Sequence, residues 1–173
     1  MALTIDATVG GASANSFVTV VEMTAYCEGR LNASVWVASA AQEPALVESA
    51  RELSALNWQG LTVSETQALN WPRQYVCDVD SPSGLYFATT IIPQRVKDAA
   101  CELALQFLKA GTTDIAAMPT TEGVIEKTVD VLTTRWADPR AQKVGLRRYP
   151  SVWRTIQPLL LSAGGIVVPL VRG

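Results

Sequence analysis

The sequence predicts a mainly α-helical protein: a small helical bundle with a β-strand or hairpin arm and extended N- and C-terminal segments. Three observations support this fold class. Apolar residues recur at helical spacing between residues 17 and 111, a β-branched alternation is confined to residues 124–136, and neither end has an amphipathic period. Because 173 residues lie within the usual range of one globular domain, we expect a single domain over residues 1–173, with its helical body at about 17–111.

The first predicted helix follows an N-terminal arm. Residues 1–16 are rich in Ala, Gly, Thr and Ser and should be extended or looped. Thr19 and Glu22 match a capping box, in which each side chain accepts a hydrogen bond from the other residue's backbone N–H. A helix should therefore begin there and run to about Leu31, and residues 32–39 are expected to form a turn.

The next two helices have clearer boundaries. The second should begin near Pro44, a residue favoured in the first helical turn, and should end before Gly60. The third, at residues 93–110, carries the clearest apolar stripe, and Gly111 is its expected terminator. The intervening residues 61–92 are rich in turn signals, which predict a long ordered loop with short structure at most.

The last third of the chain combines the β arm with a tail. Residues 124–136 alternate apolar and polar side chains, which predicts a strand or a hairpin arm. A short helix is expected at residues 151–161, interrupted by Pro158. Residues 166–171 are apolar and β-prone, with no neighbouring strand in the sequence to pair with them. We therefore expect a C-terminal docking tail at about 147–173, projecting from the helical body.

Composition argues against most enzyme chemistry. The chain has no histidine, which excludes a histidine base or nucleophile triad and argues against most zinc sites. Cys27, Cys77 and Cys101 are far apart and form no CxxC pair, so we expect reduced thiols rather than disulfides or a thiolate metal site. The glycines form no phosphate-binding motif. We expect no enzymatic activity, no cofactor and no metal.

Charge and hydropathy indicate the class of partner. The 14 basic and 16 acidic residues give a net charge of −2, which argues mildly against DNA as the main partner. The mean hydropathy of +0.18 is high, but no apolar run reaches the length of a membrane span, so no membrane partner is expected. The surplus of apolar residues suggests contacts between subunits.

One segment near the C-terminus combines basic and aromatic residues. Single-strand nucleic-acid binders use this composition, but arginine and aromatic residues are also enriched in protein interfaces. Because the chain is acidic overall, we favour a protein interface over nucleic-acid binding. The residues assigned to it are Arg147, Arg148, Tyr149, Trp153, Ile166, Val168, Leu170 and Arg172.

Several strings over nearly the whole chain carry a family resemblance. They are ANSFV at 14–18, WQG at 58–60, QALNWPR at 67–73, IP at 92–93, VKDAACELA at 96–104 and the closing RG. With them the sequence resembles a phage family labelled DnaT-like single-stranded-DNA-binding proteins, whose members look like head-tail connector (adaptor) proteins of tailed phages. The residues expected to serve structure in these strings are Trp58, Gly60, Trp71, Pro72 and Arg73.

The resemblance implies a structural protein of the virion, made in the host cytoplasm and located at the head-tail junction. It implies a homo-oligomeric ring of twelve copies beneath the portal protein, which joins capsid to tail. A downstream tail or nozzle protein would be a further partner, and DNA would pass through the lumen without sequence-specific binding. The alternative is a single-stranded-DNA-binding protein in phage replication, acting through Arg147, Arg148, Tyr149, Trp153 and Arg154.

Overall fold

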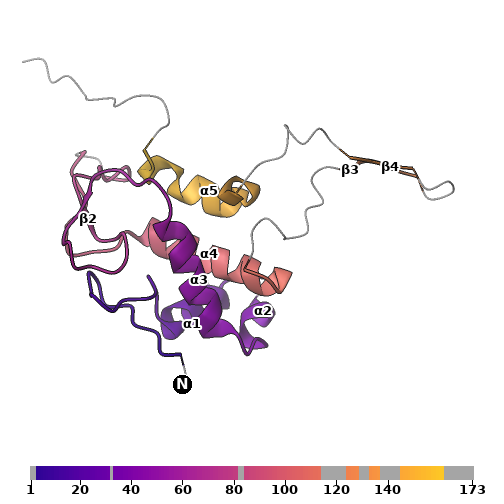
Figure 1. The fold of residues 1–173 in the computed structure, drawn as a ribbon, viewed down its shortest axis with the longest axis horizontal. Coiled ribbons are helices and arrows are strands. Elements are labelled where there is room, and N and C mark those ends of the chain that lie inside the picture. The colour runs from indigo at the N-terminus through magenta and orange to yellow at the C-terminus, as the bar shows by residue number, and fades with distance from the viewer. Residues whose placement is uncertain are drawn as a thin grey trace, which may run out of the picture.

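Helix α4 (Gln94–Ala110) lies at the centre of the helical body, and α1, α2, α3 and α5 all pack against it (Figure 1). The computed structural model describes residues 3–31, 33–81, 84–113, 124–128, 133–136 and 145–161. The predicted mainly helical fold class is confirmed.

The extended N-terminal segment lies on the chain's own loop segment. The backbone N–H of Ala68 donates to the carbonyl of Gly11 at 3.1 Å, and that of Asn15 donates to the carbonyl of Asp6 at 2.8 Å. The chain then enters α1 (Val20–Glu28) through the predicted capping box. Glu22 N–H donates to Thr19 Oγ1 at 3.1 Å, and Thr19 N–H donates to the Glu22 carboxylate at 2.7 Å.

Helix α2 (Ala33–Val37) occupies a segment expected to be a turn. Its Trp36 is completely buried, and the indole Nε1–H donates to Thr24 Oγ1 of α1 at 3.0 Å. A five-residue helix is too short to be stable alone. Its formation here depends on packing against α1 and α4, which no local pattern shows.

Helix α3 (Gln42–Ser54) buries Leu46, Ala50 and Leu53 in the protein's interior and packs along α4. Helix α4 begins directly after Pro93 and ends at Gly111, whose φ of +66° is left-handed. Helix α4 matches its prediction at both ends, because Pro93 and Gly111 are local boundary signals. Helix α3 begins close to the predicted Pro44 but ends at Ser54, so the predicted stop at Gly60 is wrong: that glycine lies in the following loop, where its backbone approaches Gln74.

The segment that follows the described part of the β arm returns to the helical body. It consists of the 3₁₀ helices η2 (Gly145–Arg148) and η3 (Gln157–Leu159) on either side of α5 (Pro150–Ile156). Leu146, Val152, Ile156 and Leu159 share one buried cluster with residues of α4, and α5 lies along α4 in Figure 1.

This arrangement corrects the expected start of the projecting tail at residue 147. Residues 145–161 belong to the body because α4 covers the apolar face of α5, which includes the buried residues Val152 and Ile156. The predicted β-prone run at 166–171 lies outside the described residues.

The predicted β arm is a hairpin. Strand β3 (Val124–Thr128) pairs antiparallel with β4 (Thr133–Trp136), with Val124 opposite Trp136, Thr128 opposite Thr133 and a register irregularity between Val124 and Glu126.

The long loop between α3 and α4 is ordered by short pairings. Strand β1 (Leu61–Thr62) pairs antiparallel with β2 (Arg73–Gln74), and a single bridge joins Cys77 to Tyr86. Beneath them, Trp71 makes edge-to-face contacts with Trp58 and Phe87, at centroid distances of 5.5 and 6.4 Å.

Arg73 and Gly60 join the two sides of this loop. The Arg73 guanidinium donates to the carbonyls of Gln59 and Gly60, both at 2.7 Å, and of Asn70 at 3.1 Å, and its burial lowers the pKa of Arg73. Gly60 has a φ of +68°, and a Cβ there would lie 2.1 Å from the Gln74 carbonyl oxygen. Only glycine fits this approach.

Candidate nucleic-acid interface

A groove runs between the end of α3 and the surface of α5. Its volume is about 310 Å³. Its floor and walls are mainly apolar, with two side-chain amides and one guanidinium at the edges. The lining residues are Leu56, Asn57, Arg147, Trp153, Gln157, Leu160 and Leu161.

Backbone hydrogen bonds hold the two walls of the groove together. Leu161 N–H donates to the Asn57 carbonyl at 2.9 Å, and Gln59 N–H donates to the Leu159 carbonyl at 3.0 Å. The Gln59 side-chain amide also donates to the carbonyls of Pro158 and Leu160, at 3.0 and 3.2 Å. The groove is therefore a fixed feature of the fold, because its walls are joined at several points.

Arg147 and Trp153 form a stacked pair at the groove. The guanidinium carbon of Arg147 lies 5.0 Å from the centroid of the Trp153 ring, within the range of a cation–π interaction. The Trp153 side chain is half-buried and Arg147 is exposed. Helix α5 packs against η2, and Trp153 lies in the first turn of α5, where its N–H donates to the Tyr149 carbonyl at 2.8 Å.

The segment that carries this pair is strongly basic. Residues 145–161 contain Arg147, Arg148 and Arg154 and no acidic residue, so their local charge is +3 in a chain whose net charge is −2. Arg154 Nε–H donates to the Pro150 carbonyl at 3.1 Å. In the part of the chain that the structure describes, neither Arg147 nor Arg154 pairs with a carboxylate.

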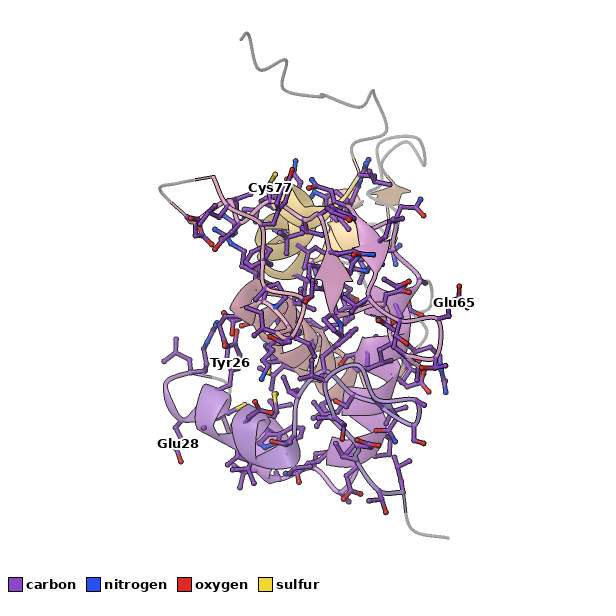
Figure 2. All side chains as sticks on the ribbon, turned by 90° about the vertical axis from the view of Figure 1, so that its left-hand side faces the viewer. Tyr26, Glu28, Glu65 and Cys77 are labelled. Atoms are coloured by element: carbon purple, nitrogen blue, oxygen red, sulfur yellow. The ribbon has the colours of Figure 1, made fainter. Side chains whose placement is uncertain are left out.

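Four cations on other elements of the described chain have acidic partners. Arg30, Arg51, Arg95 and Lys97 each form an ion pair, at 2.5 to 2.6 Å, with Glu102, Glu48, Asp80 and Glu22 respectively. Figure 2 shows Tyr26, whose hydroxyl donates to Glu102, on α1, whereas Glu28 of the same helix points away from the body. Because Arg147 and Arg154 pair with no carboxylate among the described residues, the η2–α5 segment is a cationic surface suited to phosphate.

Tyr149 lies beside the stacked pair in the sequence and is half-buried. Burial raises the pKa of Tyr149, with a smaller opposing effect of Arg148, so its phenol is neutral at physiological pH. It adds no negative charge to this surface.

The structure places four of the eight predicted interface residues together: Arg147, Arg148, Tyr149 and Trp153. Ile166, Val168, Leu170 and Arg172 lie outside the described residues. Asn57, Leu56 and Leu161 of the groove were missed by sequence reasoning. No local signal could have found them, because about 100 residues separate the two walls and only the folded backbone joins them.

The structural motif residues lie beside this groove without lining it. Trp58 and Trp71 are 2% and 1% exposed, and the Trp58 indole N–H donates to the Leu53 carbonyl at 2.8 Å. Pro72 is buried and follows a cis Trp71–Pro72 peptide bond. These residues support the wall formed by residues 57–60 from behind.

The described residues hold no group of three or more His, Cys, Asp and Glu side chains placed to bind a metal ion. None of the helices described is long and apolar enough to cross a membrane.

Comparison with known families adds one finding. The model of the family described as "Putative DnaT-like ssDNA binding protein" matches residues 1–173. The chain belongs to this family. Comparisons with curated proteins and with solved structures found no match.

The family match corrects the prediction of a virion connector. The family is described by single-stranded-DNA binding, and nothing in the match supports a portal-binding protein, a dodecameric ring or a structural role in the virion. The connector prediction rested on the resemblance, and the net charge of −2 was only a mild argument against DNA beside it. Exposed charges act over a screening length of about 8 Å at physiological ionic strength, so the local charge of the η2–α5 surface matters more than the total.

Proposed function

We propose that this protein binds single-stranded DNA through the η2–α5 surface, with Arg147 and Trp153 at the centre of the contact. The observation that carries the proposal is their stacked geometry at 5.0 Å, at the edge of a groove and in a segment with three arginines and no carboxylate. The family description supports the same chemistry.

The groove residues divide into three chemical roles. Arginines attract and hydrogen-bond phosphate oxygens, and we assign this role to Arg147 and Arg154. Trp153 offers an aromatic surface on which a base can stack, and a guanidinium above the ring extends that stack. The amides of Asn57 and Gln157 can donate to or accept from base edges.

The proposed activity is binding without a chemical step. Arg147 is the only ionisable residue among those that line the groove, and a guanidinium remains protonated and cannot serve as a general base there. Stacking and phosphate contacts do not depend on base identity, so we expect little sequence preference.

Salt dependence tests this proposal. Fluorescence anisotropy of labelled oligothymidine with the full chain should show affinity that falls as salt rises, because phosphate contacts release bound cations. Replacing both Arg147 and Arg154 by alanine should make the slope of log affinity against log salt less steep by about 1.4, at about 0.7 per contact on a single strand.

Arg30→Ala is a charge-matched control for the single variants Arg147→Ala and Arg154→Ala, each of which should make the slope less steep by about 0.7. Arg30 follows α1, which lies across α4 from α5 in Figure 1, and it pairs with Glu102. Its removal should leave the salt slope unchanged. Absence of binding at low salt would overturn the proposal. So would a salt slope in the Arg147→Ala and Arg154→Ala variants equal to that of the wild type.

A further inference from the structure

Two tyrosines form an exposed pair on the long loop between α3 and α4. Tyr75 and Tyr86 are 64% and 60% exposed, and their rings meet edge to face, with centroids 6.3 Å apart and planes at 90°. Aromatic side chains contribute most to stability when buried. Two that contact each other and remain exposed therefore mark a candidate contact surface.

The backbone at Tyr75 is strained. Its φ is +63°, a left-handed value that bulky residues rarely adopt, and every other positive φ among the described residues belongs to a glycine. Gln74, before it, pairs with Leu61 of β1, while Val76, after it, is completely buried. These two neighbours hold the strained residue between them, and its ring faces outward. Strain of this kind is found preferentially at binding sites.

Tyr86 is held on the opposite side of the same loop. Phe87 N–H donates to the Val76 carbonyl at 3.0 Å, and Asp78 N–H donates to the Leu85 carbonyl at 2.8 Å. These bonds flank the bridge between Cys77 and Tyr86. Both tyrosines are therefore fixed before any ligand arrives, which lowers the entropic cost of binding.

The tyrosine pair is connected to the groove by a short stretch of backbone. Asn57 lines the groove, and three residues later Gly60 contacts the carbonyl of Gln74, the residue before Tyr75. Three residues of extended chain span at most about 11 Å, so Gly60 lies within that distance of Asn57. A path from the groove to Tyr75 therefore follows residues 57–60 and crosses to Gln74.

The charges around the pair cancel. Asp80 pairs with Arg95 at 2.5 Å, and Asp78 and Arg73 are the other charged residues in the adjoining backbone. Two arginines and two aspartates leave no net charge to attract phosphate. The ligand group that suits this surface is a flat, uncharged ring.

We propose that Tyr75 and Tyr86 are a second contact for single-stranded DNA, on which bases stack after the strand leaves the groove at Arg147 and Trp153. This proposal rests on the proposed function and extends it. It assigns phosphate contacts to the η2–α5 surface and a phosphate-independent contact to the tyrosine pair. The two contacts can be told apart because only phosphate contacts change the salt dependence of affinity.

The first test compares affinity and salt slope in variants of the pair. Tyr75→Gly removes the ring and suits the left-handed backbone, so the fold should be retained, as melting followed by circular dichroism will show. Combined with Tyr86→Ala, it should weaken binding of a long oligothymidine by about tenfold or more while leaving the salt slope unchanged. Binding of a dinucleotide, which cannot reach both contacts, should not change.

Two control variants separate stacking from general loss of surface. Leu85→Ala removes a side chain that is 63% exposed beside Tyr86 and carries no ring, so affinity should remain as in the wild type. Tyr75→Phe combined with Tyr86→Phe keeps both rings and should retain most of the wild-type affinity.

Photo-crosslinking provides the second test. Oligonucleotides that carry 5-iododeoxyuridine should form ultraviolet-induced crosslinks at Tyr75 or Tyr86, located by mass spectrometry of the peptides. This proposal is overturned if the double variant binds long oligonucleotides as tightly as the wild type and no crosslink maps to either tyrosine. In that case the proposed function still stands, provided that the wild type binds in a salt-dependent manner. If the wild type self-associates and the double variant loses this self-association while keeping its DNA affinity, the proposal is also overturned and the pair is assigned to a protein contact.

Discussion

The hydroxyl of Tyr26 on α1 donates a hydrogen bond to Glu102 on α4 at 2.8 Å. Arg30 completes the cluster: its guanidinium stacks on the Tyr26 ring at 4.4 Å, donates to the hydroxyl and pairs with Glu102 at 2.5 Å. One tyrosine therefore ties the first helix to the central one, on the side of the body away from the proposed DNA contact.

This cluster predicts a pH dependence of stability. Burial, and then the neighbouring Glu102 carboxylate, raise the pKa of Tyr26 above its ordinary value of 10.0. The unfolded chain therefore loses the phenolic proton first, so the stabilisation by Tyr26 is complete below about pH 10 and is lost as the pH rises above it. Tyr26→Phe should cost about 1 kcal/mol at pH 7 and should flatten the alkaline decline, measured by urea unfolding between pH 7 and 11. An equally steep decline in the variant would show that another group causes it.

Gly60→Ala should destabilise the fold strongly. The added Cβ would meet the Gln74 carbonyl oxygen at 2.1 Å, at a residue whose φ is +68°. We expect a loss of about 2 to 4 kcal/mol in the free energy of unfolding, from left-handed strain and the forced shift together.

Gly84→Ala is the matched control for that prediction. Gly84 has a φ of +62° but no atom within 4 Å of an added Cβ, so only the backbone strain of about 1 kcal/mol should appear. If the two variants lose equal stability in urea, the close approach at Gly60 has no energetic consequence.

The three cysteines should differ sharply in reactivity. Cys77 is exposed, whereas Cys27 and Cys101 are 1% and 2% exposed, and burial is the main cause that raises the pKa of both buried thiols. With a disulfide reagent such as DTNB at pH 8, we expect one thiol to react quickly in the native protein and three in denaturant. Figure 2 shows Cys77 at the end of the molecule remote from α1. A native count of two or three would mean that the α1–α4 contact opens readily.

Arg147→Lys should separate charge from stacking at the groove. Lysine keeps the positive charge, but its ammonium lacks the planar face that lies 5.0 Å from the Trp153 ring. We expect the salt slope for oligothymidine to be retained, while affinity falls by about 1 kcal/mol. Trp153→Leu should lower affinity by about 1 to 3 kcal/mol with the slope again unchanged. A changed slope in either variant would contradict the roles assigned to the pair.

Features that depend on neighbours in the sequence were predicted well. The capping box of Thr19 and Glu22 spans four residues, and the stop at Gly111 needs only one residue that tolerates a left-handed backbone. The stripe along α4 repeats every three or four residues, so its buried face follows from spacing alone. The basic and aromatic composition of residues 145–161 could likewise be recognised without coordinates.

The remaining features depend on contacts between distant residues, and only the tertiary structure decided them. Trp36 holds α2 in a helix through a contact with α1, and the hydrogen bond from Leu161 to Asn57 forms the groove from segments about 100 residues apart. Tyr75 takes its left-handed backbone because Gln74 pairs outward with β1 while Val76 packs inward. The sequence by itself determined the helices other than α2, the hairpin and the basic segment, since their signals are local. Packing determined α2, the surroundings of the basic segment and which aromatic rings stay exposed, because those energies exist only when the chain has folded.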